Sequence, residues 1–174
     1  MTTHIKLNWL HRISILCFLL IPLSSLAQKT KMIPFELKDQ FKTEYTEQSW
    51  PDSILISLGS NKAGNIYNHI WAKAIQDSTS IIFPKTPIKQ IGIANLKGVP
   101  FFLKGFIRGK FPDEGDVWIL MDWKGQFSRS YHFVADQCNI LIFDRKRNLV
   151  YQTSVTELND LKLRAILEVL RKIE

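Results

Sequence analysis

The pattern of apolar and polar residues predicts seven strands along the chain. The stretch 53–58 is largely apolar, which is typical of a central strand that is covered on both faces. The other runs are apolar or alternate apolar with polar residues, as strands with one buried face do. These other strands are expected over 35–40, 43–48, 88–95, 117–121, 139–143 and 149–153.

Apolar residues spaced four apart predict three helices. The first is capped by Ser60 or Asn61 and ends at 77–78, the second runs from Pro100 to about Lys110, and the third covers 156–173 with Thr156 as its candidate cap. A short helix is also expected over 126–132. The first helix has two adjacent apolar rows, which are Ile66, Ile70 and Ala74, and Tyr67, Trp71 and Ile75.

The order of these elements predicts the fold class. Strand–helix–strand units are followed by an antiparallel hairpin and a packing helix, which indicates an α/β fold with a mixed central sheet flanked by helices. The hairpin loop is 144–148, and Asn148 is expected to take the left-handed conformation there. With 174 residues, 45% of them hydrophobic, the chain fits one domain with a substantial core.

The N-terminus has the pattern of an export signal. Lys6 and Arg12 precede the apolar stretch 13–23, and small residues lead to a predicted cleavage near Ala27. We therefore expect a signal peptide over 1–27, a polar lead-in over 28–33 and a periplasmic or secreted protein without stable membrane insertion after cleavage. The alternative is that the segment is retained as an N-terminal anchor.

The net charge and the cysteine content exclude some classes of function. Removal of the signal lowers the formal net charge from +7 to +5, and an exported chain of modest positive charge is not expected to bind nucleic acid. It also removes Cys17 and leaves Cys138 as the single cysteine. An intrachain disulfide and a C-x-x-C motif are then excluded, and a lone thiol of this kind is most often buried.

Three stretches resemble landmarks of redoxin domains, the peroxiredoxin-type elaboration of the thioredoxin-like fold. Residues 35–40 (FELKDQ) resemble the opening F-x-L-x-D-Q, and 120–131 contain the segment D-x-x-G-x-x-x-x-x-Y. Residues 140–144, followed by Leu149 and Val150, resemble the terminal hairpin. Within this group, the chain resembles exported proteins of the YtfJ type. The resemblance implies a thioredoxin-like domain over 34–174.

The chain differs from this family at the positions where the family has its redox-active cysteines. The junction between the first central strand and its helix, 59–65, contains no cysteine, and the T-x-x-C pattern is missing. The cis-proline of the fold would fall near 137–139, where no proline occurs. The resemblance therefore implies a degenerate redox position without dithiol exchange. Its residues are Asn61, Lys62, Ala63, Gly64 and Cys138.

Other motifs have simpler explanations than a functional site. The junction 59–65 lacks the spacing of a phosphate-binding loop, and 113–116 lacks the ligand spacing of a calcium loop, so a turn is expected in each case. Basic residues at 104, 108 and 110 and at 145–147 are expected to form solvated faces, and the alternative is that they recruit a partner by charge. No metal ion or cofactor is expected.

Two functions from different classes follow from this sequence. The first is an exported, redox-inactive binding or accessory module that contacts a protein or peptide through the degenerate redox position. The alternative is a one-cysteine thiol peroxidase or mixed-disulfide oxidoreductase that uses Cys138. That reaction requires an accessible thiolate, which a helix N-terminus and Lys62 could stabilise and which burial would oppose.

Overall fold

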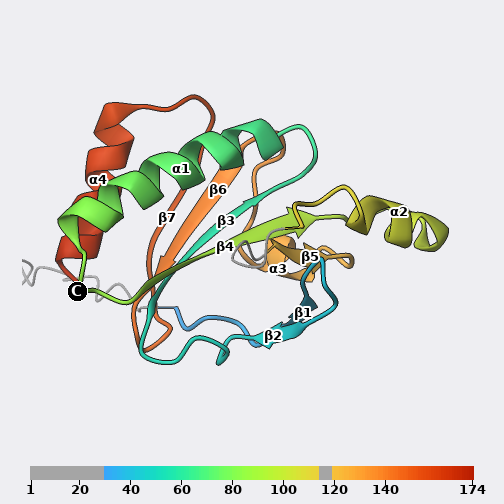
Figure 1. Cartoon of the computed structure of the whole chain (residues 1–174), viewed down its shortest axis with the longest axis horizontal. Helices are drawn as coiled ribbons and strands as arrows, with labels where there is room; N and C mark the ends of the chain where they lie inside the picture. Colours follow the sequence, from blue (N-terminus) through green and yellow to red (C-terminus); the bar gives the residue numbers. More distant parts are fainter. Residues whose placement is uncertain (1–29, 114–118) are drawn as a thin grey trace, which may run out of the picture.

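The structure, a computed structural model, describes residues 30–113 and 119–174, and its centre is a five-stranded mixed sheet (Figure 1). The strand order in this sheet is β5-β4-β3-β6-β7, and β1 and β2 form a separate two-stranded sheet. The elements are β1 (Glu36–Lys38), β2 (Glu44–Thr46), β3 (Ile54–Ser60), α1 (Asn65–Ile82), β4 (Ile88–Asn95), η3 (Phe101–Leu103), α2 (Lys104–Arg108), β5 (Ile119–Asp122), α3 (Gln126–Ser130), β6 (Cys138–Phe143), β7 (Leu149–Val155) and α4 (Asp160–Arg171).

Strand β3 lies in the middle of the sheet, as its apolar sequence predicts. All seven of its residues are buried. It pairs in parallel with β4, with Ile54 opposite Ile88, and antiparallel with β6, with Ser57 opposite Leu141. Strand β5 continues the parallel side, and β7 continues the antiparallel side as the second strand of the hairpin. The expected mixed sheet flanked by helices is confirmed.

The two faces of the sheet are covered by different elements. Alternation along β6 directs Cys138, Ile140 and Ile142 into a core beneath α1 and α4, which lie together on one face (Figure 1). It directs Leu141 and Phe143 into a second core, which contains apolar residues of α3 and of the segments before β3. The second core also includes Met32, so part of the expected polar lead-in packs against the domain.

Helix α1 differs from its prediction at both ends. It begins at Asn65 with Gly64 as N-cap and no side-chain cap, because Ser60 is the last residue of β3. It continues to Ile82 instead of ending at 77–78. The polar residues there remain helical because their hydroxyl groups donate to carbonyl oxygens one turn back, as Thr79 does to Ile75 at 2.8 Å.

Only one of the two apolar rows of α1 reaches the core. Trp71 and Ile75 are fully buried, whereas Ile66 and Ile70 are exposed on the outer surface. The indole N–H of Trp71 donates to the carbonyl oxygen of Thr156 at 2.9 Å and so ties α1 to the chain before α4. The predicted helix is present, and it packs against the sheet along the row of Trp71 and Ile75, because a helix on a sheet buries one stripe.

The hairpin and the last helix also correct the sequence analysis. Arg147, and not Asn148, adopts the left-handed conformation, with φ of 62°. Asn148 is instead held by Asp144, whose carboxylate accepts from both its backbone and side-chain N–H groups at 2.8 Å. Helix α4 begins at Asp160, and its cap is Asn159 rather than Thr156.

The expected helix over 100–110 is present as the short pieces η3 and α2, which project beyond the sheet (Figure 1). Its aromatic residues are exposed rather than packed. Within residues 30–113 and 119–174, no helix has both the length and the apolar character needed to cross a membrane. The predicted signal peptide, most of the 113–116 turn and the start of the strand expected at 117 lie outside the described residues.

Candidate functional site

The loop predicted to be a degenerate redox position lies at the carboxyl edge of the parallel strands. Strands β3 and β4 run in the same direction, and Ser60 at the end of β3 pairs with Ala94 near the end of β4. The loop of residues 61–64 leaves β3 here and leads into α1. In α/β sheets, ligands bind most often beyond the carboxyl ends of the strands.

Hydrogen bonds join the 61–64 loop to the segment before β6, residues 133–137. The side-chain amide of Asn61 donates to the carboxylate of Asp136 at 2.8 Å. Its oxygen accepts from the backbone N–H of Asp136 at 3.3 Å and from that of Gly64 at 3.1 Å. Asp136 has a φ of 61°, so this segment is a tight turn directed at the loop. The two segments therefore form one connected surface.

Gly64 brings the backbones of the two segments into direct contact. A Cβ atom at this position would lie 2.6 Å from the carbonyl oxygen of Gln137 and 2.8 Å from its nitrogen. Any side chain would therefore displace the backbone of the 133–137 segment. Lys62 and Ala63 remain exposed, so the outer part of the loop is its accessible part.

Asn139 fixes the 133–137 segment from inside the protein. Its buried amide donates to the carbonyl oxygens of Gly59 and Val134, both at 3.0 Å, and of Gln137 at 3.2 Å. Its oxygen accepts from the backbone N–H of Val134 at 2.7 Å and from the hydroxyl of Ser154 at 2.8 Å. A buried network that is satisfied in this way holds the loop in one conformation.

Cys138 lies next to this network but faces the other side of the sheet. Its side chain is buried in the core beneath α1, among Leu58, Trp71 and Ile140. Burial raises the pKa of the thiol to about 12. The thiolate is the reactive form of cysteine, so this thiol is protonated and enclosed at neutral pH. The structure thus brings Asn61 and Gly64 together with the backbone before Cys138, but not with its sulfur.

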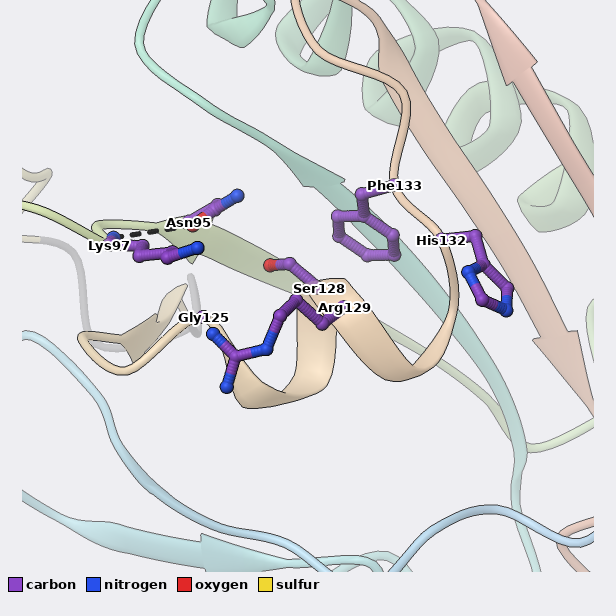
Figure 2. Close-up of a pocket in the computed structure, with 7 residues that line it drawn as sticks. All are labelled: Asn95, Lys97, Gly125, Ser128, Arg129, His132 and Phe133. Carbon is purple, nitrogen blue, oxygen red and sulfur yellow. Dashed lines mark hydrogen bonds between the residues drawn. The ribbon is translucent and has the colours of Figure 1, made fainter.

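A polar pocket that the sequence did not predict adjoins the 133–137 segment at Phe133. Its volume is about 290 Å³, and Phe133, whose ring contacts Gly59, forms one side of it (Figure 2). Lys97 and Ser128 face one another across it. The lining residues are Asn95, Lys97, Gly125, Ser128, Arg129, His132 and Phe133.

The chemistry of this basic pocket suits an anionic group. Asn95, Lys97 and Arg129 provide N–H donors and two positive charges, and no carboxylate is among the lining residues. The nearby carboxylate of Asp122 is buried beneath α3, where it accepts from the backbone N–H groups of Gln126 and Ser128 at 2.9 Å. A lysine two residues beyond a parallel strand was the sequence signal that could have indicated this pocket.

The two basic clusters do not both form solvated faces. In the first, Lys104 and Arg108 lie over the ring of Trp123, 5.2 and 5.9 Å from its centroid. In the second, Arg147 is a structural residue: its guanidinium donates to the carbonyl oxygens of Glu47 at 2.9 Å, Ser53 at 2.8 Å, and Trp50. Burial lowers the pKa of Arg147, while the carboxylates of Asp144 and Asp52 act in the opposite direction.

Metal ligands do not assemble at this edge. In the part of the chain that the structure describes, no three His, Cys, Asp or Glu side chains lie close enough together to hold a metal ion. His132 lines the basic pocket, and the buried thiol of Cys138 lies on the other face of β6.

Comparison with solved structures defines the fold as thioredoxin-like. A putative thiol:disulfide interchange protein DsbE from Chlorobium tepidum matches with a TM-score of 0.61 at 12% identity, covering 83% of this chain and 96% of that one. The exposed lipoprotein thioredoxin of Streptococcus pneumoniae matches with a TM-score of 0.57 at 14% identity, covering 80% and 99%. Copper-bound ScoI of Arabidopsis thaliana matches with a TM-score of 0.60 at 12% identity, covering 82% and 99%.

At these identities the likeness shows the fold alone. No protein-family model matches the chain, and no curated protein matches its sequence. The resemblance to the YtfJ type thus stays a prediction from the three sequence landmarks.

Proposed function

We propose that this protein is an exported, redox-inactive thioredoxin-fold module that binds a protein or peptide at the carboxyl edge of its sheet. The observation that carries the proposal is the state of the redox position. Its loop contains no cysteine and is bonded to Asp136, and the single cysteine of the domain, Cys138, is buried. The scaffold is that of thiol-disulfide proteins such as the Chlorobium DsbE protein, without the thiols such a reaction uses.

The accessible groups at this edge favour an acidic or C-terminal peptide segment. Lys62 projects from the 61–64 loop, and Lys97 and Arg129 line the basic pocket next to the 133–137 segment. Cations and N–H donors arranged on a rigid support bind carboxylates through charge-assisted hydrogen bonds. Export to the periplasm or outside the cell follows from the N-terminal sequence pattern, and the name of the Streptococcus relative, an exposed lipoprotein, is consistent with it.

A photo-crosslinking amino acid placed at Lys62 tests the binding surface. Lys85 is the matched control, because it is an exposed lysine beyond the other end of α1. We expect the probe at position 62 to give a discrete crosslinked product in cells, and the product to disappear when Lys97 and Arg129 are both changed to Glu. Identical products from positions 62 and 85, or none from either, would overturn the proposed surface.

Redox inactivity is tested separately by insulin reduction with dithiothreitol. We expect the purified protein to reduce insulin no faster than dithiothreitol alone, and Cys138→Ser to behave in the same way. A rate above this background that Cys138→Ser abolishes would favour the mixed-disulfide oxidoreductase. Consumption of hydrogen peroxide that depends on Cys138 would favour the one-cysteine peroxidase. The burial of the thiol argues against both alternatives.

A further inference from the structure

The segment of residues 97–111, between β4 and β5, exposes an unusual number of aromatic side chains. Phe101 is 82% exposed, Phe102 is 70% exposed and Phe106 is 63% exposed. They lie on η3 and α2, which project away from the sheet (Figure 1). Single exposed apolar residues are common, but a group of them marks a surface for interaction. We call residues 97–111 the aromatic segment.

The cations of the aromatic segment hold it in an amphipathic arrangement. Lys104 and Arg108, four residues apart, lie over Trp123 at the end of β5. Phe102 and Phe106, also four residues apart, occupy the opposite side of the same turns and are exposed to solvent. The basic row thus faces the domain and the phenylalanine row faces outward.

The charge of this segment has a single sign. Lys97, Lys104, Arg108 and Lys110 are its only charged residues, and the sequence between them contains no Asp or Glu. The ammonium group of Lys110 lies 4.9 Å from the ring centroid of Phe106, so cationic and aromatic groups are neighbours at the tip. Lys97 lines the basic pocket, and Lys104 and Arg108 lie over Trp123, so Lys110 is the cation next to the exposed rings. A basic segment with projecting aromatic rings is complementary to a surface that is anionic outside and apolar beneath.

We propose that the aromatic segment docks the protein on an anionic lipid bilayer. The rings of Phe101, Phe102 and Phe106 enter the boundary between headgroups and acyl chains, and Lys110, beside Phe106, remains at the level of the lipid phosphates. A bilayer fits better than a protein groove as the occupant because the exposed rings lie on a short element that projects from the sheet (Figure 1) and the four charged residues between 97 and 111 are all basic. Acidic residues follow only from Asp113 onward. The association is peripheral and reversible, and it uses a surface separate from the 61–64 loop.

Co-sedimentation with lipid vesicles tests this proposal. The protein used is the form that is purified from its host cell after any processing of the N-terminus. The vesicles contain phosphatidylglycerol and phosphatidylcholine, or phosphatidylcholine alone. We expect binding to the anionic vesicles that falls about tenfold or more when salt is raised, and much weaker binding to the neutral ones. The double variant Phe102→Ser/Phe106→Ser and the double variant Lys104→Glu/Lys110→Glu are each expected to lose about tenfold or more in affinity.

The matched control is Ile66→Ser/Ile70→Ser, which removes two exposed apolar side chains of α1. This variant is expected to bind as the wild type does. Circular dichroism shows whether each variant is folded. Wild-type affinity in the Phe102→Ser/Phe106→Ser variant, or equal binding to neutral and anionic vesicles, would overturn the proposal. The proposal would also be overturned if the wild type were a dimer and Phe102→Ser/Phe106→Ser were a monomer. A second copy of the chain would then cover the rings.

Discussion

The side-chain amide of Asn139 donates to the carbonyl oxygen of Gly59 at 3.0 Å and so connects two positions that are 80 residues apart. The same amide holds the carbonyl oxygens of Val134 and Gln137. One buried side chain therefore connects strand β3 to the 133–137 segment, in addition to the bonds of Asn61 to Asp136. The shape of the candidate site is set from the interior rather than by the exposed residues of the loop.

Replacement of Asn139 by Ala should destabilise the protein by about 3 kcal/mol, because several buried backbone groups lose their partner together. Ser154→Ala is the matched control, since it removes only the hydrogen bond from Ser154 to the Asn139 oxygen. It should reduce the free energy of unfolding by about 1 kcal/mol. Urea denaturation measures both values. Equal effects of the two substitutions would contradict the central role of Asn139.

The thiol of Cys138 should be unreactive in the folded protein. Iodoacetamide at neutral pH is expected to modify it only after unfolding, because the side chain is enclosed and protonated. The rate should match that of global unfolding and should rise with urea. Rapid alkylation of the native protein at pH 7 would contradict this expectation and would identify a second, open conformation of the core beneath α1.

The raised pKa of Cys138 also predicts a dependence of stability on pH. The folded pKa, about 12, is above the ordinary value of 9.0, so the unfolded chain loses this proton first. The stabilisation is present below pH 9.0 and is lost as the pH rises toward 12. The comparison is the difference in the free energy of unfolding between the wild type and Cys138→Ala. At about pH 10.5 this difference should be about 2 kcal/mol less favourable to the wild type than at about pH 8. Parallel urea curves at these two values measure it, and a constant difference would contradict the burial of the thiol.

Replacement of Arg147 by lysine should lower the stability of the fold. Its guanidinium donates to carbonyl oxygens of Glu47, Trp50 and Ser53, which lie in different directions, and a single ammonium group cannot reach them all. Arg147→Lys is expected to lower the free energy of unfolding by about 2 kcal/mol. Arg145→Lys is the control, because Arg145 is exposed, and it should change stability by less than about 0.5 kcal/mol. Thermal unfolding distinguishes the two.

Glycine at position 64 should be required by packing alone. Gly64→Ala is expected to destabilise the protein by about 1 to 3 kcal/mol, since the new methyl group meets the backbone of Gln137. Gly105→Ala in α2 is the matched control, because no atom lies within 4 Å of its Cβ position. It should be neutral or slightly stabilising. Equal destabilisation by both substitutions would contradict the close approach at Gly64.

The sequence predicted the arrangement of elements because apolar periodicity reports which faces are covered. Strand β4 was predicted with its observed bounds, 88–95, and the continuous apolar run of β3 indicated its central place. The helix boundaries were less predictable, because hydroxyl groups such as that of Thr79 can bond within a helix as well as end it. Periodicity also could not show that the Phe102 and Phe106 row faces solvent, since an exposed stripe and a buried one have the same spacing.

The candidate site was predictable only in part. The absence of redox cysteines was visible in the sequence, and so was the place where the 61–64 loop leaves β3. Contacts between distant segments were not, because neither the Asn61 bond to Asp136 nor the basic pocket follows from local spacing. Arg147 shows the same limit: a basic run at a hairpin tip has the composition of a solvated face, and only the tertiary fold brings carbonyl oxygens to it.

The contact between Gly64 and Gln137 determines what it would take to introduce thiol chemistry at this position. Cysteines at positions 61 and 64 would restore the spacing of a C-x-x-C motif, but the first would remove the amide bonded to Asp136 and the second would place a side chain where the backbone of Gln137 lies. The two substitutions Asn61→Cys and Gly64→Cys would therefore distort the loop and the 133–137 segment, and they would not by themselves produce a working C-x-x-C site. The backbone packing at Gly64, as well as the residue types, is therefore incompatible with a C-x-x-C motif here, and introducing one would require several coordinated substitutions.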